Sequence, residues 1–222
     1  VEDCAEILAL LEGRPAPDLT GAQMAGSRLL VLETVALDDL RAAPARGFEA
    51  ALARLEAQGA RLERRRLPFV SEAMALSAIL FTAEAYGIWR DTIEAAPERM
   101  FGRILERFRS GADFRAHDFV AAWRSLRALR LNWAEAVAGF DAVVLPTAPI
   151  LPPDAARLLS DDDYYVTENL LALRNTRIGN LFGLCGVTLP TPEPSCGLSL
   201  LGLPGDERRL LRLGAAAEHA LR

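Results

Sequence analysis

Lysine is absent from this sequence, and every one of its 25 basic residues is arginine. Chemistry that needs a lysine as general base must therefore take it from outside these 222 residues. Histidine is nearly absent too, and the two that occur, His117 and His219, have no metal-ligand spacing around them. No phosphate-binding glycine pattern or nucleophile elbow occurs. The sequence predicts no metal site and no cofactor.

Cysteine is scarce, and its spacing matches no zinc or redox motif. The three cysteines are Cys4, Cys185 and Cys196, and an odd number is a poor basis for a disulfide framework. We interpret them as small buried hydrophobic residues in a reducing compartment. No signal peptide is visible, so the sequence favours a cytoplasmic protein.

Aromatic residues and positive charge are also in short supply. Aromatics make up 7% of the chain, so Leu, Val and Ala must fill the interior. No unbroken apolar run approaches the roughly 20 residues that span a bilayer. The net charge is -5 and the pI is about 5.2, which gives no broad attraction to nucleic acid or anionic lipid. We expect a globular protein that binds neither nucleic acid nor membrane.

The apolar periodicity predicts an α/β arrangement in the first third of the chain. The predicted elements are a helix over 1–12, a strand over 29–32, a helix through 48–59 and a strand over 61–69. A strand–helix–strand order implies parallel neighbours in a sheet.

The remainder alternates helices with short strands, and no linker or repeat interrupts it. The predicted elements are helices over 71–89, 98–111, 118–139, 161–173 and 206–221, and strands over 141–145, 187–189 and 198–201. We therefore expect residues 1–222 to form one unit.

Three charged clusters can be read as sites, but each has a simpler explanation. His117 and Asp118 are adjacent at a helix start, where Asp118 serves better as a cap than as an acid/base partner. The acids at 161–163 lack the alternating ligands of a calcium loop and suit a helix start. The arginines at 64–66 suit an edge strand better than a nucleic-acid patch. Composition and spacing alone assemble no catalytic site.

Three stretches together resemble the amidase-signature family. The first is Asp141-Ala-Val-Val-Leu-Pro-Thr147 followed by Pro149, similar to a family strand that ends in a Pro-Thr turn beside the active site. The second runs from Asn175 through Asn180 and Gly186 to Pro190-Thr191, similar to a family helix, Gly-rich turn and strand. The third is Gly197-Leu-Ser-Leu-Leu-Gly202-Leu-Pro-Gly-Asp206 and the helix after it. An unrelated α/β domain is the alternative, because each motif alone is common.

The resemblance implies an α/β fold with a mixed, mostly parallel sheet flanked by helices. It also implies amide hydrolysis or transfer by a Ser–cis-Ser–Lys triad, with backbone amides holding the oxyanion. In the family this machinery lies before the matched stretches. The chain has neither lysine nor a Gly-Gly-Ser-Ser loop. We therefore expect the C-terminal half of a bacterial amidase, with no catalytic residue of its own and inactive alone.

The resemblance also suggests which residues of this half face the substrate. Leu173, seven positions before Asn180, matches a position that faces the acyl pocket and favours a less polar substrate; an ordinary core residue is the alternative. Arg177 suits either a substrate carboxylate or a surface ion pair. Asn180 suits backbone stabilisation better than substrate contact. Arg107 loosely matches an arginine that binds a substrate carboxylate in the transamidase branch.

One segment departs from the family pattern. The family has a Gly soon after the Pro-Thr of the second stretch and a longer loop before the next strand. This chain reads Pro190-Thr-Pro-Glu-Pro-Ser-Cys196. Either the loop is short or residues are missing, and the adjoining pocket wall is in doubt.

Two functional hypotheses follow. The first is an amidase whose partners are a small-molecule amide and the missing N-terminal half of the same protein, with a homodimer possible. The second is a non-catalytic pseudoenzyme or partner-binding subunit. The strands at 29–32 and 143–145 carry no charge or Pro. If the missing half supplies their sheet neighbours, the isolated chain has unpaired apolar edges and aggregates.

Overall fold

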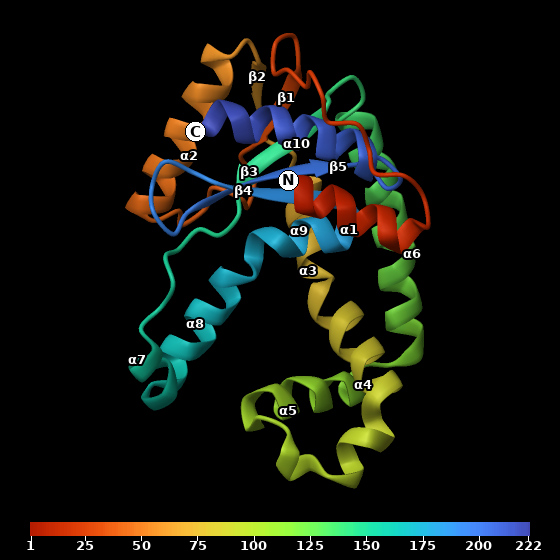
Figure 1. The fold of residues 1–222 in the computed structure, drawn as a ribbon. Coiled ribbons are helices and arrows are strands. Elements are labelled where there is room, and N and C mark those ends of the chain that lie inside the picture. The colour runs from red at the N-terminus through yellow and green to blue at the C-terminus, as the bar shows by residue number, and fades with distance from the viewer. The chain divides into compact units, whose positions relative to one another are not determined.

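The computed structural model describes residues 1–222, which form two compact units. Unit 1 comprises Val1–Pro68 and Ala134–Arg222, and unit 2 comprises Phe69–Trp133. Figure 1 shows the elements of both units in chain order. The expectation that residues 1–222 are a single unit, the C-terminal part of an amidase-signature domain, stays a prediction.

Unit 1 is built on a five-stranded mixed sheet with the order β2-β1-β3-β5-β4. β1 pairs in parallel with β2 and β3, whereas β5 pairs antiparallel with β3 and β4. The strands are β1 (Arg28–Leu32), β2 (Arg61–Arg65), β3 (Ala142–Pro146), β4 (Cys185–Pro190) and β5 (Gly197–Gly202). The α/β class and the mixed sheet flanked by helices are confirmed. The sheet is not mostly parallel as expected, because two of its four strand pairs are antiparallel.

Helices cover both faces of this sheet (Figure 1). α2 (Ala42–Ala57) and α10 (Glu207–Leu221) pack on one face, where their side chains join alternate residues of the strands in the main core. α9 (Arg174–Phe182) buries Ile178, Leu181 and Phe182. Strands buried on both faces need apolar residues at every position, which explains the unbroken apolar runs of β1 and β3.

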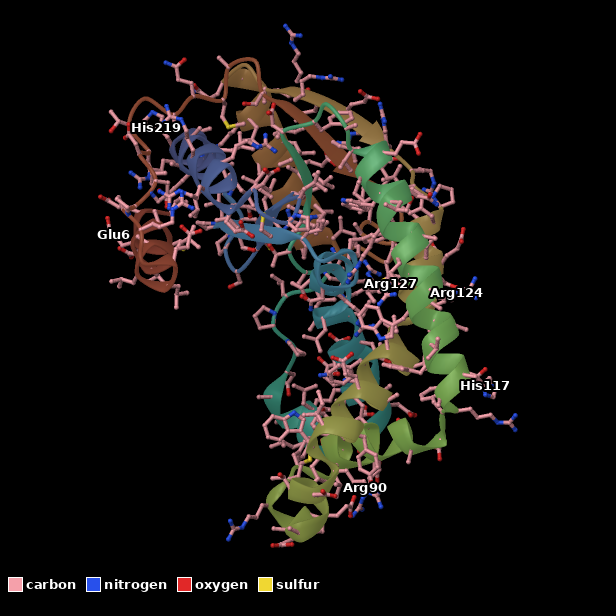
Figure 2. All side chains as sticks on the ribbon, turned by 90° about the vertical axis from the view of Figure 1, so that its right-hand side faces the viewer. Glu6, Arg90, His117, Arg124, Arg127 and His219 are labelled. Atoms are coloured by element: carbon pink, nitrogen blue, oxygen red, sulfur yellow. The ribbon has the colours of Figure 1, made fainter.

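The remaining helices of unit 1 are more peripheral. α1 (Glu2–Glu12) packs against α10 through Ala5 and Ala9 and ends at Gly13, whose φ of 64° suits glycine. The outward side of α1 leaves Ile7, Leu10 and Leu11 exposed, and Glu6 lies on this exposed surface (Figure 2). α7 (Ala155–Ser160) and α8 (Asp162–Ala172) form a hairpin that extends away from the sheet.

Unit 2 is helical. It holds α3 (Phe69–Ala75), α4 (Ser77–Ala95), η1 (Pro97–Arg99), α5 (Gly102–Arg109), η2 (Ser110–Asp113) and most of α6 (Ala116–Ala136). Gly111 allows η2 to pack tightly on α4, because a Cβ there would lie 2.0 Å from the carbonyl oxygen of Thr82. Glu94 of α4 binds Arg109 of α5 through two hydrogen bonds of 2.9 and 2.6 Å.

Three details of unit 2 differ from the sequence prediction. The helix expected over 71–89 is two helices that meet at Leu76, and the helix expected over 98–111 is three short ones. Asp118 does not cap α6, since the helix begins at Ala116 and Asp118 lies in its first turn. The side chain of His117 is exposed (Figure 2), and its Nε2 lies 3.5 Å from Oδ1 of Asp118, so the two residues form a surface pair.

The strand edges also differ from the prediction. β1 and β3 lie inside the sheet with a neighbour on each side, so the expectation that they are unpaired apolar edges is wrong. The edges are β4 and β2, and β2 carries Arg61, Glu63, Arg64 and Arg65. Charge on an edge strand discourages further pairing, so the edge-strand interpretation of this arginine run is confirmed.

Two smaller expectations also need correction. Cys4 is exposed, whereas Cys185 and Cys196 are half-buried, so none is a fully buried core residue. Residues Phe69–Ala95 are helical, long and apolar enough to cross a membrane by length and composition, and 22% of the most apolar window is buried. A search for unbroken apolar runs misses this segment because Glu72 and Glu84 interrupt it. Core helices of soluble proteins pass the same test.

Candidate functional site

The carboxyl ends of β1 and β3 lie side by side because the strands are parallel neighbours. In α/β sheets this edge is where ligands commonly bind. The side chain of Asn175, at the start of α9, crosses it and is fully buried. Its Nδ2 donates to the carbonyl oxygen of Ala36, 3.0 Å away, and to that of Pro146, 2.7 Å away. One amide group therefore ties the segments after β1 and β3 to α9.

Arg174 reinforces this connection. Its Nε donates to Oδ1 of Asn175 at 3.2 Å, and a terminal nitrogen donates to the carbonyl oxygen of Ala36 at 3.4 Å. Burial lowers the pKa of the Arg174 guanidinium, while the carboxylates of Asp38 and Asp39 oppose that shift. The acids compensate part of the cost of burying this cation.

The segment held by these two side chains is strained. Val35 has a φ of 63°, a left-handed conformation that is rare for a β-branched residue. The amide of Ala36 donates to the carbonyl oxygen of Thr34 at 2.7 Å, which closes a tight turn around Val35. The hydrogen bonds from Asn175 and Arg174 to the Ala36 carbonyl help to hold this turn. Strain of this kind concentrates at functional sites.

A row of hydroxyl groups crosses the sheet next to this edge. Oγ of Ser199 lies 2.8 Å from Oγ1 of Thr147 and 2.9 Å from Oγ1 of Thr188. Gly197 permits this approach, because a Cβ there would lie 2.7 Å from Oγ1 of Thr147. The row consists of hydroxyls that bond to one another, with no base to take a proton from Ser199. It can fix the Pro-Thr turn, but it does not form a nucleophile.

The residues predicted to face substrate lie in both units. Leu173, Arg177 and Asn180 follow the helical spacing i, i+4, i+7, so they share one side of α9 and its start. Leu173 is 44% exposed, Arg177 is half-buried and Asn180 is exposed. Arg107 is half-buried on α5 of unit 2. The structure brings the first three together, and the substrate role of all four stays a prediction.

Sequence reasoning missed four polar residues of unit 1. The sequence marks Asn175 only as the start of a motif, and it gives no signal for Arg174, Arg41 or Glu168. Glu168 is buried and receives a bidentate hydrogen bond from Arg41, with NH1 to Oε2 at 2.8 Å. No local pattern reveals this pair, because its members are 127 positions apart.

The segment that departs from the resemblance is a short hairpin loop. The β4–β5 pairing runs to Pro190 opposite Gly197, and the amide of Thr191 donates to the carbonyl oxygen of Cys196 at 3.0 Å. Oγ1 of Thr191 also donates to carbonyl oxygens inside the loop. Gly47 of α2 packs on it, where a Cβ would lie 2.6 Å from Oγ1 of Thr191. The loop is therefore a short, closed turn, and its place in a pocket wall stays a prediction.

Together, the mixed sheet, the hydrogen-bond network at the carboxyl ends of β1 and β3 and the Pro-Thr turn define an α/β protein with an organised sheet edge. The Amidase family model matches residues 18–211. The chain belongs to this amidase-signature family.

Relatives agree with this assignment across most of the chain. It is 29% identical over 98% of its length to 2-amino-5-chloromuconic acid deaminase from Comamonas testosteroni, of which it covers 49%. It is 32% identical over 47% of its length to a fatty acid amide hydrolase from Oryza sativa subsp. indica, covering 18% of that protein. The chain thus spans about half the length of the first relative and less of the second.

Solved structures agree on the fold. A crystal structure of an amidase superposes with a TM-score of 0.75 at 22% identity, covering all of this chain and 51% of that one. A protein described as part of a vestigial complex related to an s-triazine catabolic enzyme superposes with a TM-score of 0.72 at 19% identity. This superposition covers 90% of the present chain and 45% of the chain in that structure.

Proposed function

We propose that this chain is the C-terminal, substrate-facing portion of an amidase that hydrolyses a carboxylic amide C–N bond. The observation that supports it most is the family match over 18–211 in a chain with no lysine. The catalytic Ser–cis-Ser–Lys triad would then lie in an N-terminal half contributed by the same protein. Asn175 and Arg174 would hold the wall that this half meets.

The substrate in this proposal is a small cytoplasmic amide with an apolar acyl part. The exposed Leu173 favours an apolar group near the start of α9, and Arg177 provides a cation one turn further on. An acidic side chain at Leu173 would instead have favoured a substrate amino group. No cofactor is needed, because the proposed chemistry uses serine and lysine side chains.

Intact mass and ammonia release test the proposal together. The protein is purified from its source with antibodies to this chain and its mass is compared with 24.1 kDa. Ammonia release is then assayed with primary amides of increasing acyl length and with glutamine. We expect a mass well above 24.1 kDa, hydrolysis of the apolar amides, and no hydrolysis by the isolated 222-residue chain. A purified protein of 24.1 kDa that hydrolyses amides would refute the external triad.

A second function has one observation in its favour. The exposed side chains of Ile7, Leu10 and Leu11 give α1 an apolar surface of the kind that meets a partner chain. A non-catalytic subunit would use this surface to bind its partner. A native mass of 24.1 kDa per chain, a stable hetero-complex and no amide hydrolysis would favour this function over the amidase.

A further inference from the structure

The α7–α8 hairpin fully buries no apolar side chain. No residue of α7 is buried, and Glu168 is the one buried residue of α8. Val166 and Leu170 are 54% and 42% exposed, and Leu159 is 78% exposed. Because apolar burial supplies most of the energy that fixes a helix in place, α8 needs another attachment.

Inside the hairpin the polar contacts are extensive. Asp161 caps α8 by accepting from the amide of Tyr164 at 2.9 Å, and Arg157 donates to the same carboxylate at 3.0 and 3.1 Å. The hydroxyl of Tyr164 accepts from the amide of Asp154 at 3.1 Å. These contacts join α7 to α8, so the two helices can move together as one piece.

One attachment of the hairpin to the rest of unit 1 is the Glu168–Arg41 ion pair. Both terminal nitrogens of Arg41 donate to the two carboxylate oxygens of Glu168, and the hydrogen bond to Glu168 raises the pKa of Arg41. The side chain of Glu168 is 2% exposed and that of Arg41 is 48% exposed. A buried carboxylate that loses its partner is strongly unfavourable, so the pair resists separation.

Arg41 is itself fixed to the sheet edge. It immediately precedes α2, and its main-chain amide donates to the carbonyl oxygen of Pro149 at 2.9 Å, just beyond β3. Through Arg41, α8 is therefore tied to the same sheet edge that the Asn175 side chain bridges. The irregular segment 151–154 precedes the hairpin, and the turn residue Leu173 follows it.

Leu173 links the end of α8 to α9, the helix that carries Arg177 and Asn180. It follows Ala172, the last residue of α8, and immediately precedes α9, and the amide of Arg177 donates to its carbonyl oxygen at 3.1 Å. We propose that Glu168, held by Arg41, is a positioning residue that fixes where α8 ends and therefore where Leu173 and Arg177 are presented. The substrate-facing part rests on the proposed function, whereas the attachment does not.

Hydrogen exchange tests the attachment on the purified protein that carries this chain, without any substrate. For Glu168→Gln we expect amides of 155–173 to exchange at least about tenfold faster, because a charge-assisted hydrogen bond is weakened. Amides of β1, β3 and β5 should be unchanged. Glu49→Gln is the matched control, because it breaks an exposed Arg64–Glu49 pair of unit 1 at 2.6 Å.

A second variant separates position from charge. Arg41→Met with Glu168→Met replaces the ion pair by apolar side chains and should restore slow exchange in 155–173. Unchanged exchange in Glu168→Gln, or equal acceleration across the whole sheet, would overturn the attachment.

Kinetics then test the positioning of the substrate-facing residues. In the active protein, Glu168→Gln should raise KM several-fold with kcat within about twofold, since the loss is one of substrate binding. In the double Met variant, KM should return close to the wild-type value. Faster exchange with an unchanged KM would refute positioning. A wild-type protein without amidase activity would refute the proposed function, while the exchange result would still decide the attachment.

Discussion

Units 1 and 2 bury their side chains to different extents. Every residue of β3 is buried, and α2 buries Phe48, Ala51, Leu52 and Leu55 against the sheet. In unit 2, α4 buries three of its 19 residues and α5 buries none. Unit 1 therefore has a large apolar core, whereas the buried apolar side chains of unit 2 lie mainly on α6, and α4 and α5 depend on close contacts and polar groups.

The tryptophans make this difference measurable. All three, Trp89, Trp123 and Trp133, lie in unit 2, so tryptophan fluorescence reports mainly on that unit. Far-UV circular dichroism reports the helices of both. If the units differ in stability as their burial indicates, fluorescence should change at a lower urea concentration than dichroism. Coincident transitions would show that they unfold together.

Removal of a large core side chain should have the largest effect. Phe48→Ala should cost about 3–5 kcal/mol of unfolding free energy, because the ring is fully buried and leaves a cavity. Phe81→Ala in unit 2 should cost at most about 1 kcal/mol, since that ring is half exposed and makes an edge contact with Phe108. Urea titrations of both variants by dichroism check the contrast. Equal losses would break the comparison.

Asn175→Ala should come next. It removes the donor to two carbonyl groups at the sheet edge, and the free energy of unfolding should fall by roughly 2–4 kcal/mol in total. Asn180→Ala is the matched control on the same helix and should cost less than about 0.5 kcal/mol, because its side chain is exposed. Urea unfolding followed by dichroism measures both. Similar costs for the two variants would show that the Asn175 amide does not hold the edge.

These two asparagines show how far the sequence reaches. Much of the fold can be predicted from local patterns. Burial on both faces gives the unbroken apolar runs of β1 and β3, and burial on one face gives the helical periodicity of α2 and α10. Which asparagine of α9 is buried depends on how the helix lies on the sheet, which no local pattern encodes. The break at Leu76 was missed for a related reason, because neither Gly nor Pro marks it.

Contacts between distant residues were the least predictable. Glu168 follows Thr167 and precedes Asn169, so its burial has no local signal, and its partner Arg41 lies 127 positions away in the sequence. Strand order was equally hidden, and this led to the wrong expectation that β1 and β3 are edges. The arginines of β2 could be read correctly because charge on an edge strand is a local property.

Gly111→Ala tests whether close packing holds unit 2. The added Cβ would meet the main-chain oxygen of Thr82, which cannot move without distorting α4, so we expect a cost of about 1–3 kcal/mol. Gly87→Ala is the control, because a Cβ there meets nothing within 4 Å and the change should stabilise the helix by about 0.5–1 kcal/mol. Fluorescence-detected urea unfolding measures both. A neutral Gly111→Ala would show that η2 is loosely packed.

The smallest expected effect is a pH dependence confined to unit 2. Hydrogen bonds from Arg109, helped by the hydroxyl of Tyr86, lower the pKa of Glu94 from 4.5 to about 2. Because the folded-state pKa lies below the unfolded value, the stabilisation is fully present above pH 4.5 and is lost as the pH falls toward 2.

The carboxylate of Glu94 is exposed to solvent, which screens this contribution and keeps it small. The fluorescence-detected melting temperature of the wild type should therefore exceed that of Glu94→Gln slightly at neutral pH. The difference should close between pH 4.5 and 2. A difference that persists at the acid end would mean that the ionised Glu94–Arg109 pair is not what joins α4 to α5, and that unit 2 relies on packing as unit 1 does.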